Sequence, residues 1–167
     1  LSYGNGSVDT PFSIEAWINI ISDNTFGILV KGNATDGYEY FFRVNATSLK
    51  LNVEMASQGA FTAYIGRIAS VGLSLGIWYH LVLTYDGSST EGGIKIFQNT
   101  VRVDDTADSG GVYVAGNNTT SIATIGRLWT DGANYGDGIV GEVRAYNRAL
   151  SAGEVMRNYQ ATKWRYQ

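Results

Sequence analysis

Short apolar segments separated by glycine-rich turns run through almost the whole chain, and they limit its fold more than any other feature of the sequence. In the segment FSIEAWINI, a period of two places one set of side chains on a single face of an extended strand: Phe12, Ile14, Ala16, Ile18 and Ile20. Similar segments follow, namely YEYFFRVN, LKLNVEM, TAYIGR, WYHLVLTYD, GIKIFQN and ATIGR. All are rich in aromatic and β-branched residues, which pack well on a pleated sheet.

The turns between these segments are rich in glycine, asparagine, aspartate and serine, as in SDNTFG, GNATDG, YDGSSTEGG and VAGNNTT. Such residues adopt left-handed turn conformations at little steric cost. Pro11 lies where the first strand begins, so its missing N–H costs no ladder bond. The spacing predicts an all-β, two-sheet antiparallel jelly-roll sandwich, built as a single domain over residues 1–167 and closed by a last strand near residues 139–146.

A helix signal follows the last strand. Ser151 and Glu154 have the spacing of a capping box, in which each side chain accepts a hydrogen bond from the backbone N–H of the other residue. Leu150 and Val155 are spaced to form a hydrophobic staple across this box. The sequence therefore predicts a short C-terminal helix that starts at Ser151 and ends near Tyr159.

The composition excludes several classes of protein. The 167 residues are 44% hydrophobic and 16% charged, which is enough apolar material to bury a core. The net charge is −3 and no basic run occurs, so we expect no nucleic-acid partner. The sequence contains no run of 18 apolar residues, which argues against membrane insertion. It also contains no cysteine, which excludes disulfides. The chain starts at Leu1 without a signal-peptide pattern, so we expect a mature form or an excised piece.

Five segments occur in a characteristic order: FSIEAWI, WYHLVLTYDG, GIKIFQN, TIGR and GEVRAYNRALSAGEV. Together they resemble the serial motifs of laminin G-like domains of the concanavalin A-like lectin/glucanase superfamily, of the type found in bacterial, phage and environmental surface proteins. The resemblance covers nearly the whole chain and implies two antiparallel sheets, one of them concave. The tail NYQATKWRYQ is similar to the ends of such domains in phage and environmental virion or surface proteins.

The resemblance also bears on calcium. The last strand of the family commonly carries an aspartate just before Glu-Val-Arg, and that aspartate can help to hold a structural calcium ion. Gly141 stands at this position, so one of the six to eight oxygen ligands that calcium needs is missing. We therefore expect no required cofactor, and the glycine weakens the case for a structural calcium. A second departure is the turn at Asn99 and Thr100, where the family often has Asp-Gly, and this change leaves the fold intact.

Catalytic patterns of the superfamily are absent from the sequence. Its family 16 glycoside hydrolases carry E-x-D-x-E or a close variant on one strand, with the two glutamates on either side of the sugar bond. Here the strand glutamates lie on different segments and are expected on solvated strand faces: Glu15, Glu39, Glu54 and Glu142. The sequence therefore predicts that the chain is not an enzyme.

Three further features favour structural over functional roles. His80 alone cannot form a histidine metal cluster and is predicted to be a packed structural residue. The stretch Asp104–Gly111 lacks the spacing of a calcium-binding EF-hand loop, and we expect a solvated loop there. GDGIVG over residues 136–141 matches a nucleotide-binding fingerprint by letter, but it leads into a strand instead of a helix.

The loop RLWTDGANYGDG, residues 127–138, is the candidate ligand-binding site. It combines two aromatic residues with three amide or carboxylate residues: Trp129, Asp131, Asn134, Tyr135 and Asp137. Aromatic faces pack on sugar rings, while amides and carboxylates bind hydroxyl groups. The alternative is that the tryptophan and the tyrosine fold back and cover the end of the sandwich. The same two interpretations apply to other aromatic residues: Tyr38, Tyr40, Tyr64 and Trp164.

Two functions remain open from the sequence. The first is a non-catalytic recognition or adhesion module that binds glycan or protein at a cell or virion surface, outside the cell. The second is a structural subunit of a virion, fibre or extracellular filament that binds copies of itself or a larger parent assembly and no sugar. The fold hosts both kinds of function.

Overall fold

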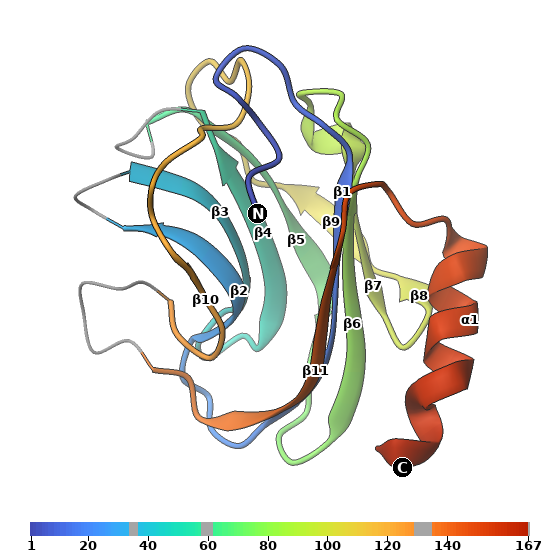
Figure 1. The fold of residues 1–167 in the computed structure, drawn as a ribbon. Coiled ribbons are helices and arrows are strands. Elements are labelled where there is room, and N and C mark those ends of the chain that lie inside the picture. Colours follow the sequence, from blue (N-terminus) through green and yellow to red (C-terminus); the bar gives the residue numbers. More distant parts are fainter. Residues whose placement is uncertain (34–36, 58–61, 129–134, 167) are drawn as a thin grey trace.

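The computed structural model describes residues 1–33, 37–57, 62–128 and 135–166, which form two packed antiparallel sheets and one helix (Figure 1). The five-stranded sheet has the order β11 (Gly138–Tyr146), β1 (Phe12–Ile20), β6 (Trp78–Tyr85), β7 (Ile94–Gln98) and β8 (Val101–Arg102). The six-stranded sheet has the order β10 (Ala123–Thr124), β2 (Phe26–Asn33), β3 (Gly37–Val44), β4 (Lys50–Ala56), β5 (Tyr64–Gly72) and β9 (Asp104–Ala107). The predicted jelly-roll sandwich is confirmed.

The core lies between the two sheets and follows the predicted alternation. On β1, Ile14, Ala16, Ile18 and Ile20 are buried in it, and Phe12 packs against it. The six-stranded sheet contributes alternate residues such as Phe42 on β3. The strands β2 and β3 bend so that the hollow side of this sheet faces away from the five-stranded sheet (Figure 1). We call this outer side the concave face.

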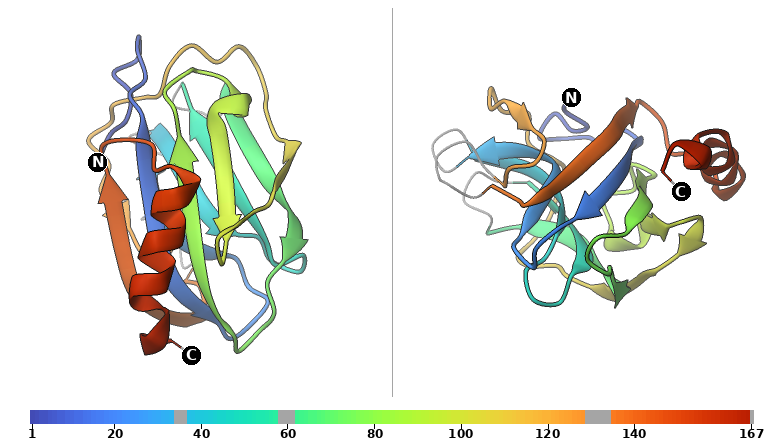
Figure 2. Two further views of the ribbon diagram at one scale, coloured as in Figure 1. Left: turned by 90° about the vertical axis from the view of Figure 1, so that its right-hand side faces the viewer. Right: turned by 90° about the horizontal axis from the view of Figure 1, so that it is seen from below.

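The helix α1 (Ala152–Thr162) lies against the outer face of the five-stranded sheet and continues into a 3₁₀ turn, Lys163–Arg165 (Figures 1 and 2). The capping box is confirmed, because Ser151 accepts from the Glu154 N–H and Glu154 accepts from the Ser151 N–H. Leu150 and Val155 share one buried cluster, as the staple predicts. The helix ends later than expected, since it continues past Tyr159.

Two segments differ from the expectations. The strand β2 lies between two turn-rich stretches and was not predicted; it is buried along its whole length, so it shows a continuous apolar run instead of alternation. The expected loop at Asp104–Gly111 is wrong for its first half, which forms the edge strand β9. The Asp104 carboxylate is buried there, where it accepts from Arg102 and from the Ile96 N–H.

Several smaller expectations hold. Asn99 and Thr100 both have positive φ, 47° and 77°, and form the tight turn between β7 and β8. The glycine-rich stretch at residues 136–141 leads into β11 and not into a helix. A short 3₁₀ turn, Glu91–Gly93, precedes β7. None of the helices that the structure describes has the length and apolar character needed to cross a bilayer.

Candidate functional site

The concave face carries a hydrogen-bonded group of polar side chains. Phe42 and Val53 point into the core, so the alternation of a strand turns their neighbours outward. These neighbours are Arg43 on β3 and Asn52 and Glu54 on β4. The Arg43 guanidinium donates from Nη2 to Glu54 Oε1 at 2.6 Å and from Nε to Asn52 Oδ1 at 2.9 Å.

Asp108 joins this group from the chain that follows β9. Asn52 Nδ2 donates to Asp108 Oδ2 at 3.0 Å, and the Asp108 carboxyl is in hydrogen-bonding contact with Glu54 and Tyr64. A β-carbon on Gly66 would overlap the Asp108 carbonyl, so the glycine permits this close approach of the chain to β5. We call five residues the polar cluster: Arg43, Asn52, Glu54, Tyr64 and Asp108.

The cluster changes the protonation of Glu54. Burial raises the pKa of Glu54 from 4.5 to about 7, although Arg43 opposes this rise, and the Asp108 carboxylate adds to it. Glu54 therefore takes up a proton near neutral pH and can donate it in a hydrogen bond to Asp108. The Asp108 carboxylate, together with burial, raises the pKa of the Tyr64 hydroxyl, which stays a donor. Such a mixture of donors and acceptors suits the hydroxyl groups of a sugar.

An apolar group adjoins the polar cluster on the same face. Val30, Phe41 and Leu128 form a buried cluster, against which Tyr38 packs. The Arg43 guanidinium lies over the Phe41 ring, 5.3 Å from its centroid. Leu128 is the second residue of the predicted ligand loop, so the described start of that loop packs on the concave face beside Phe41.

The structure describes only part of the predicted loop site. Trp129, Asp131 and Asn134 lie outside the described residues. Tyr135 is 64% exposed, and the Arg127 guanidinium lies 5.0 Å from the centroid of its ring. Asp137 is exposed, and its carbonyl accepts from the Ile21 N–H. Tyr135 is thus available to a ligand and does not cover the end of the sandwich.

The other ambiguous aromatic residues separate clearly. Tyr40 belongs to the core, while Tyr38 and Tyr64 are half-buried on the concave face. Trp164 is 70% exposed and lies on the helical side of the molecule. Of these four, Tyr64 belongs to the polar cluster and Tyr38 packs against the adjoining apolar group.

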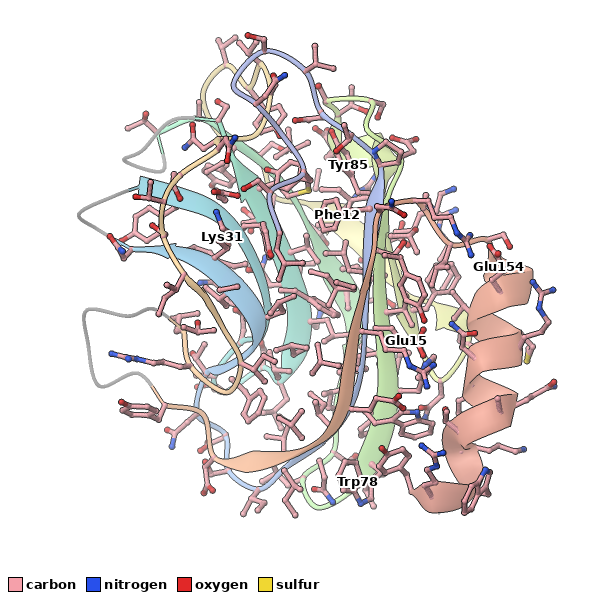
Figure 3. All side chains as sticks on the ribbon, viewed as in Figure 1. Phe12, Glu15, Lys31, Trp78, Tyr85 and Glu154 are labelled. Carbon is pink, nitrogen blue, oxygen red and sulfur yellow. The ribbon has the colours of Figure 1, made fainter. Side chains whose placement is uncertain are left out.

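A second polar group lies on the opposite side, beneath α1. Figure 3 shows Glu15 on the side of β1 that faces the helix. Its carboxylate accepts from Asn158 Nδ2 at 2.6 Å and from the Tyr146 hydroxyl at 3.1 Å, and His80 Nε2 lies 3.1 Å from it. His80 is fully buried between Glu15 and the rings of Trp17 and Tyr159, so its structural role is confirmed.

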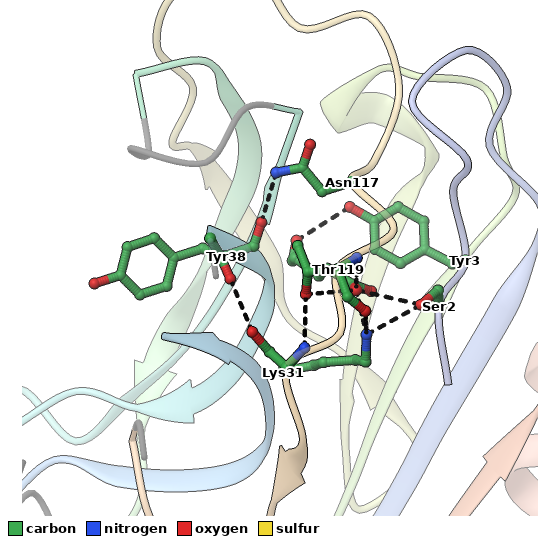
Figure 4. Close-up of polar contacts among 9 residues, drawn as sticks. Ser2, Tyr3, Lys31, Tyr38, Asn117 and Thr119 are labelled. Carbon is green, nitrogen blue, oxygen red and sulfur yellow. Dashed lines mark hydrogen bonds and ion pairs between the residues drawn. The ribbon is translucent and has the colours of Figure 1, made fainter. Parts of the chain in front are cut away.

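A third polar group is a buried ion pair at the open flank of the sandwich. Lys31 Nζ contacts Glu39 Oε1 and also donates to the Thr119 carbonyl at 2.9 Å and to Ser2 Oγ at 3.1 Å (Figure 4). The Thr119 N–H donates to the same Glu39 oxygen at 2.6 Å. These bonds tie the N-terminal segment and the long loop before β10 to the six-stranded sheet.

The expectation of solvated strand glutamates is wrong for three of the four. Glu15, Glu39 and Glu54 are 2%, 0% and 8% exposed, because each has cationic or hydrogen-bond-donating partners that make burial tolerable, and Glu142 is half-buried. Arg43, Asn52 and Asp108 were not predicted as site residues. Asp108 lies 54 positions after Glu54, so no local spacing reveals that their carboxyl groups meet.

The residues around Gly141 do not form a calcium site of carboxylates. Gly141 is the extra residue of a β-bulge opposite Trp17, and a β-carbon there would overlap the ring of Tyr166. Among the described residues, no group of three or more histidine, aspartate or glutamate side chains is arranged to hold a metal ion. The glycine therefore has a packing explanation, which is the space that Tyr166 occupies.

The comparisons with known proteins agree with this architecture. A laminin G-like profile, described as the concanavalin A-like lectin/glucanases superfamily, matches residues 2–156. The chain belongs to this superfamily. The match extends from the N-terminal segment into α1, so it includes every strand of both sheets. A comparison with curated proteins finds no significant match.

Solved structures with the same fold share little sequence with this chain. A heptameric pentraxin from Limulus polyphemus is 16% identical, with a TM-score of 0.61 over 92% of this chain and 70% of its own. A candidate carbohydrate binding protein from Bacteroides ovatus is 21% identical, with a TM-score of 0.63 over 90% and 43%. A sialidase from Trypanosoma rangeli is 15% identical, with a TM-score of 0.64 over 92% and 23%. The chain thus spans less than half of the length of the last two proteins. At these sequence identities, the similarities concern the fold alone.

Proposed function

We propose that this chain is a non-catalytic recognition or adhesion module that binds glycan across its concave face, at a cell or virion surface. The observation that carries the proposal is the polar cluster, which adjoins the apolar group of Val30, Phe41 and Leu128 on the concave face. The cluster supplies charged donors and acceptors, and the exposed ring of Tyr135 in the predicted loop would add an aromatic contact to a sugar. The Bacteroides ovatus neighbour supports a carbohydrate ligand at the level of the fold.

The arrangement of the carboxyl groups supports a binding function without catalysis. Retaining glycosidases hold their two carboxyl groups about 5–5.5 Å apart, with the sugar bond between them. Glu54 and Asp108 are instead in hydrogen-bonding contact with each other, which leaves no room for a bond to be cleaved between them. The sialidase neighbour shares the fold only.

A glycan-array screen, run with calcium and with EDTA, tests this proposal. We expect binding that Asp108→Asn and Tyr135→Ala each weaken about tenfold or more, since an aromatic contact and a charged hydrogen bond are each worth about 1.5 kcal/mol or more. Matched controls are Asp23→Asn, an exposed aspartate outside the cluster, and Trp164→Ala, an exposed aromatic on the helical side. A blank array, or equal loss in variants and controls, contradicts the proposal.

A structural subunit of a virion, fibre or extracellular filament is the second candidate. It is supported by the heptameric pentraxin among the neighbours and by exposed apolar residues at one end of the sandwich: Ile21, Leu75, Ile77 and Ile139. Sedimentation over a range of concentrations separates the two functions. Self-association together with a blank glycan array favours the subunit, and a monomer that binds glycan favours the recognition module.

A further inference from the structure

The two sheets end unequally at one flank of the sandwich. The strand β11 is the edge of the five-stranded sheet and is nine residues long, whereas β10, the edge of the facing sheet, has two residues. Both edges lie on the same side of the molecule (Figures 1 and 2). In the part of the chain that the structure describes, the ladder partner of β11 is β1 alone, so the backbone groups of its other edge have no strand partner.

The inner face of β11 is incompletely covered as a result. Val140, Val143 and Ala145 pair with buried core residues of β1 and therefore point inward with them. Nevertheless Val140 and Val143 are only half-buried, and Ala145 is exposed. The two-residue strand β10 is too short to cover them, so one more strand beside β11 would complete the layer.

A pocket of about 400 Å³ opens beside the C-terminal half of β11. Its walls are mainly apolar and aromatic and include Tyr3, Phe12, Ile14, Leu29, Tyr40 and Ala145. Ligand pockets in proteins commonly have volumes of about 300–1,000 Å³ and such linings. Figure 3 shows Phe12, on its wall, directed to the side of β1 away from the helix, and so away from the Glu15 group.

Hydrogen bonds hold the wall formed by the N-terminal segment in place. Asp9 accepts from the Tyr85 and Tyr113 hydroxyl groups at 2.6 and 2.9 Å and from the Gly116 N–H at 2.6 Å. Ser2 bonds the Lys31–Glu39 pair at the rim (Figure 4). The Tyr3 ring stacks on Phe12 with centroids 4.8 Å apart. The pocket is therefore preformed, which lowers the entropy cost of filling it.

Beyond the bulge at Gly141, the edge lacks the features that normally prevent strand addition. Lysines, prolines and inward-pointing charges protect natural sheet edges. β11 contains no lysine or proline, and its charged residues Glu142 and Arg144 bond each other at 2.7 Å on the outer face. The bulge at Gly141 interrupts regular pairing, so the regular part of the edge runs from Glu142 to Tyr146.

We propose that this regular part of β11 is a docking site for an extended segment of another polypeptide. The segment adds to the five-stranded sheet as a sixth strand and places one large apolar side chain in the pocket. A polypeptide fits better than a glycan, because a row of alternating N–H and C=O groups is satisfied by another backbone and the adjoining pocket is apolar. This surface is separate from the concave face, so it serves a partner in addition to a glycan.

A synthetic heptapeptide with alternating threonine and apolar residues and a central tryptophan tests the proposal. Its binding is measured by fluorescence anisotropy, and amide hydrogen exchange reports where it binds. We expect slower exchange over residues 142–146 on binding, and at least a tenfold loss of affinity when the tryptophan is replaced by serine. A peptide with proline at the two positions on each side of the tryptophan keeps the tryptophan side chain but loses N–H donors from both edges of the strand, and we expect it not to bind.

A matched pair of protein variants places the peptide on β11. Ala145→Lys introduces a charge at the pocket, whereas Ala107→Lys places the same charge at an exposed position on β9, the four-residue edge strand of the other sheet. We expect Ala145→Lys to weaken binding at least tenfold and Ala107→Lys to leave it unchanged. Undetectable peptide binding, equal binding of the proline peptide, or unchanged exchange over residues 142–146 overturns the proposal. A dimer that Ala145→Lys dissociates also overturns it and identifies a second copy as the occupant.

Discussion

Gly141 and Tyr166 occupy adjoining space on the outer face of the five-stranded sheet, and a β-carbon on the glycine would overlap the tyrosine ring. The ring stacks on Trp17 with centroids 4.6 Å apart and contacts Trp78 at 4.8 Å. The missing side chain in the last strand thus allows the end of the chain to pack on the sheet. Packing against Tyr166 explains the glycine without reference to a metal.

We expect Gly141→Ala to lower the free energy of unfolding by about 1–3 kcal/mol, because overpacking forces the Tyr166 ring away from Trp17. In a Tyr166→Ala background, Gly141→Ala should lower the free energy of unfolding much less. Urea unfolding of the two single variants and the double variant gives the coupling energy. If the two substitutions lower the free energy of unfolding additively, the glycine is required by the bulge itself and not by the space that the Tyr166 ring occupies.

Calcium removal should leave stability unchanged. The described residues contain no group of three acidic or histidine side chains suited to a metal, and the position of the family aspartate is occupied by Gly141 beneath Tyr166. We expect the same Tm in EDTA and in millimolar calcium. A Tm that rises by several degrees with calcium, but not with the same concentration of magnesium, would contradict this prediction, since ligand binding to the native state stabilises it.

Glu54 should make the protein less stable as the pH rises from about 4.5 to about 7. Burial, the largest cause, raises its pKa from 4.5 to about 7, so in this window the unfolded chain releases a proton that the folded chain retains. The stabilisation is complete below pH 4.5 and is lost as the pH passes the folded pKa, at no more than about 1.4 kcal/mol per pH unit.

The Glu54→Gln variant tests this dependence, because glutamine keeps the shape and cannot ionise. In urea unfolding between pH 4.5 and 8, the free energy of unfolding should fall less with rising pH for this variant than for the unmodified chain. Asp23→Asn, at an exposed aspartate, is the control, and its free energy of unfolding should fall with rising pH as in the unmodified chain. An identical pH profile in Glu54→Gln would show that another group titrates in this window.

The sequence predicted the parts of this fold that local chemistry determines. The alternation on β1 identified its inner face, and Ser151 with Glu154 identified the start of the helix, because both signals lie within a few residues. The strand β2 was missed, since burial on both faces removes alternation. Periodicity also failed to predict that Glu39 is buried, because the register shift between Lys31 and Gly32 interrupts the alternation of the strand pair.

The candidate site was harder to predict than the fold. The loop with Tyr135 was predicted as a site from its residue types, which suit sugars, and it stays a prediction. The polar cluster was not found, since Arg43, Glu54 and Asp108 come from β3, β4 and the chain after β9. Only the sheet pairing brings them together, and pairing between distant strands leaves no mark in local spacing.

Glu15 should have the opposite pH effect to Glu54. Burial alone would raise its pKa, but His80, Asn158 and Tyr146 together outweigh burial and lower the pKa below 4.5. The stabilisation from Glu15 is therefore present above pH 4.5 and is lost as the pH falls through the folded pKa. Acid should accordingly weaken the contact between α1 and the sheet.

Asn158→Ala tests this prediction, because Asn158 Nδ2 donates to the Glu15 carboxylate at 2.6 Å. We expect a loss of about 1.5–3 kcal/mol at pH 7, the range for hydrogen bonds to charged groups, and a smaller further loss on acidification than in the unmodified chain. Gln160→Ala, an exposed position on the same helix, controls for helix propensity. Equal acid sensitivity in both variants would show that Asn158 does not set the pKa of Glu15, and that His80 and Tyr146 hold the carboxylate beneath the helix without it.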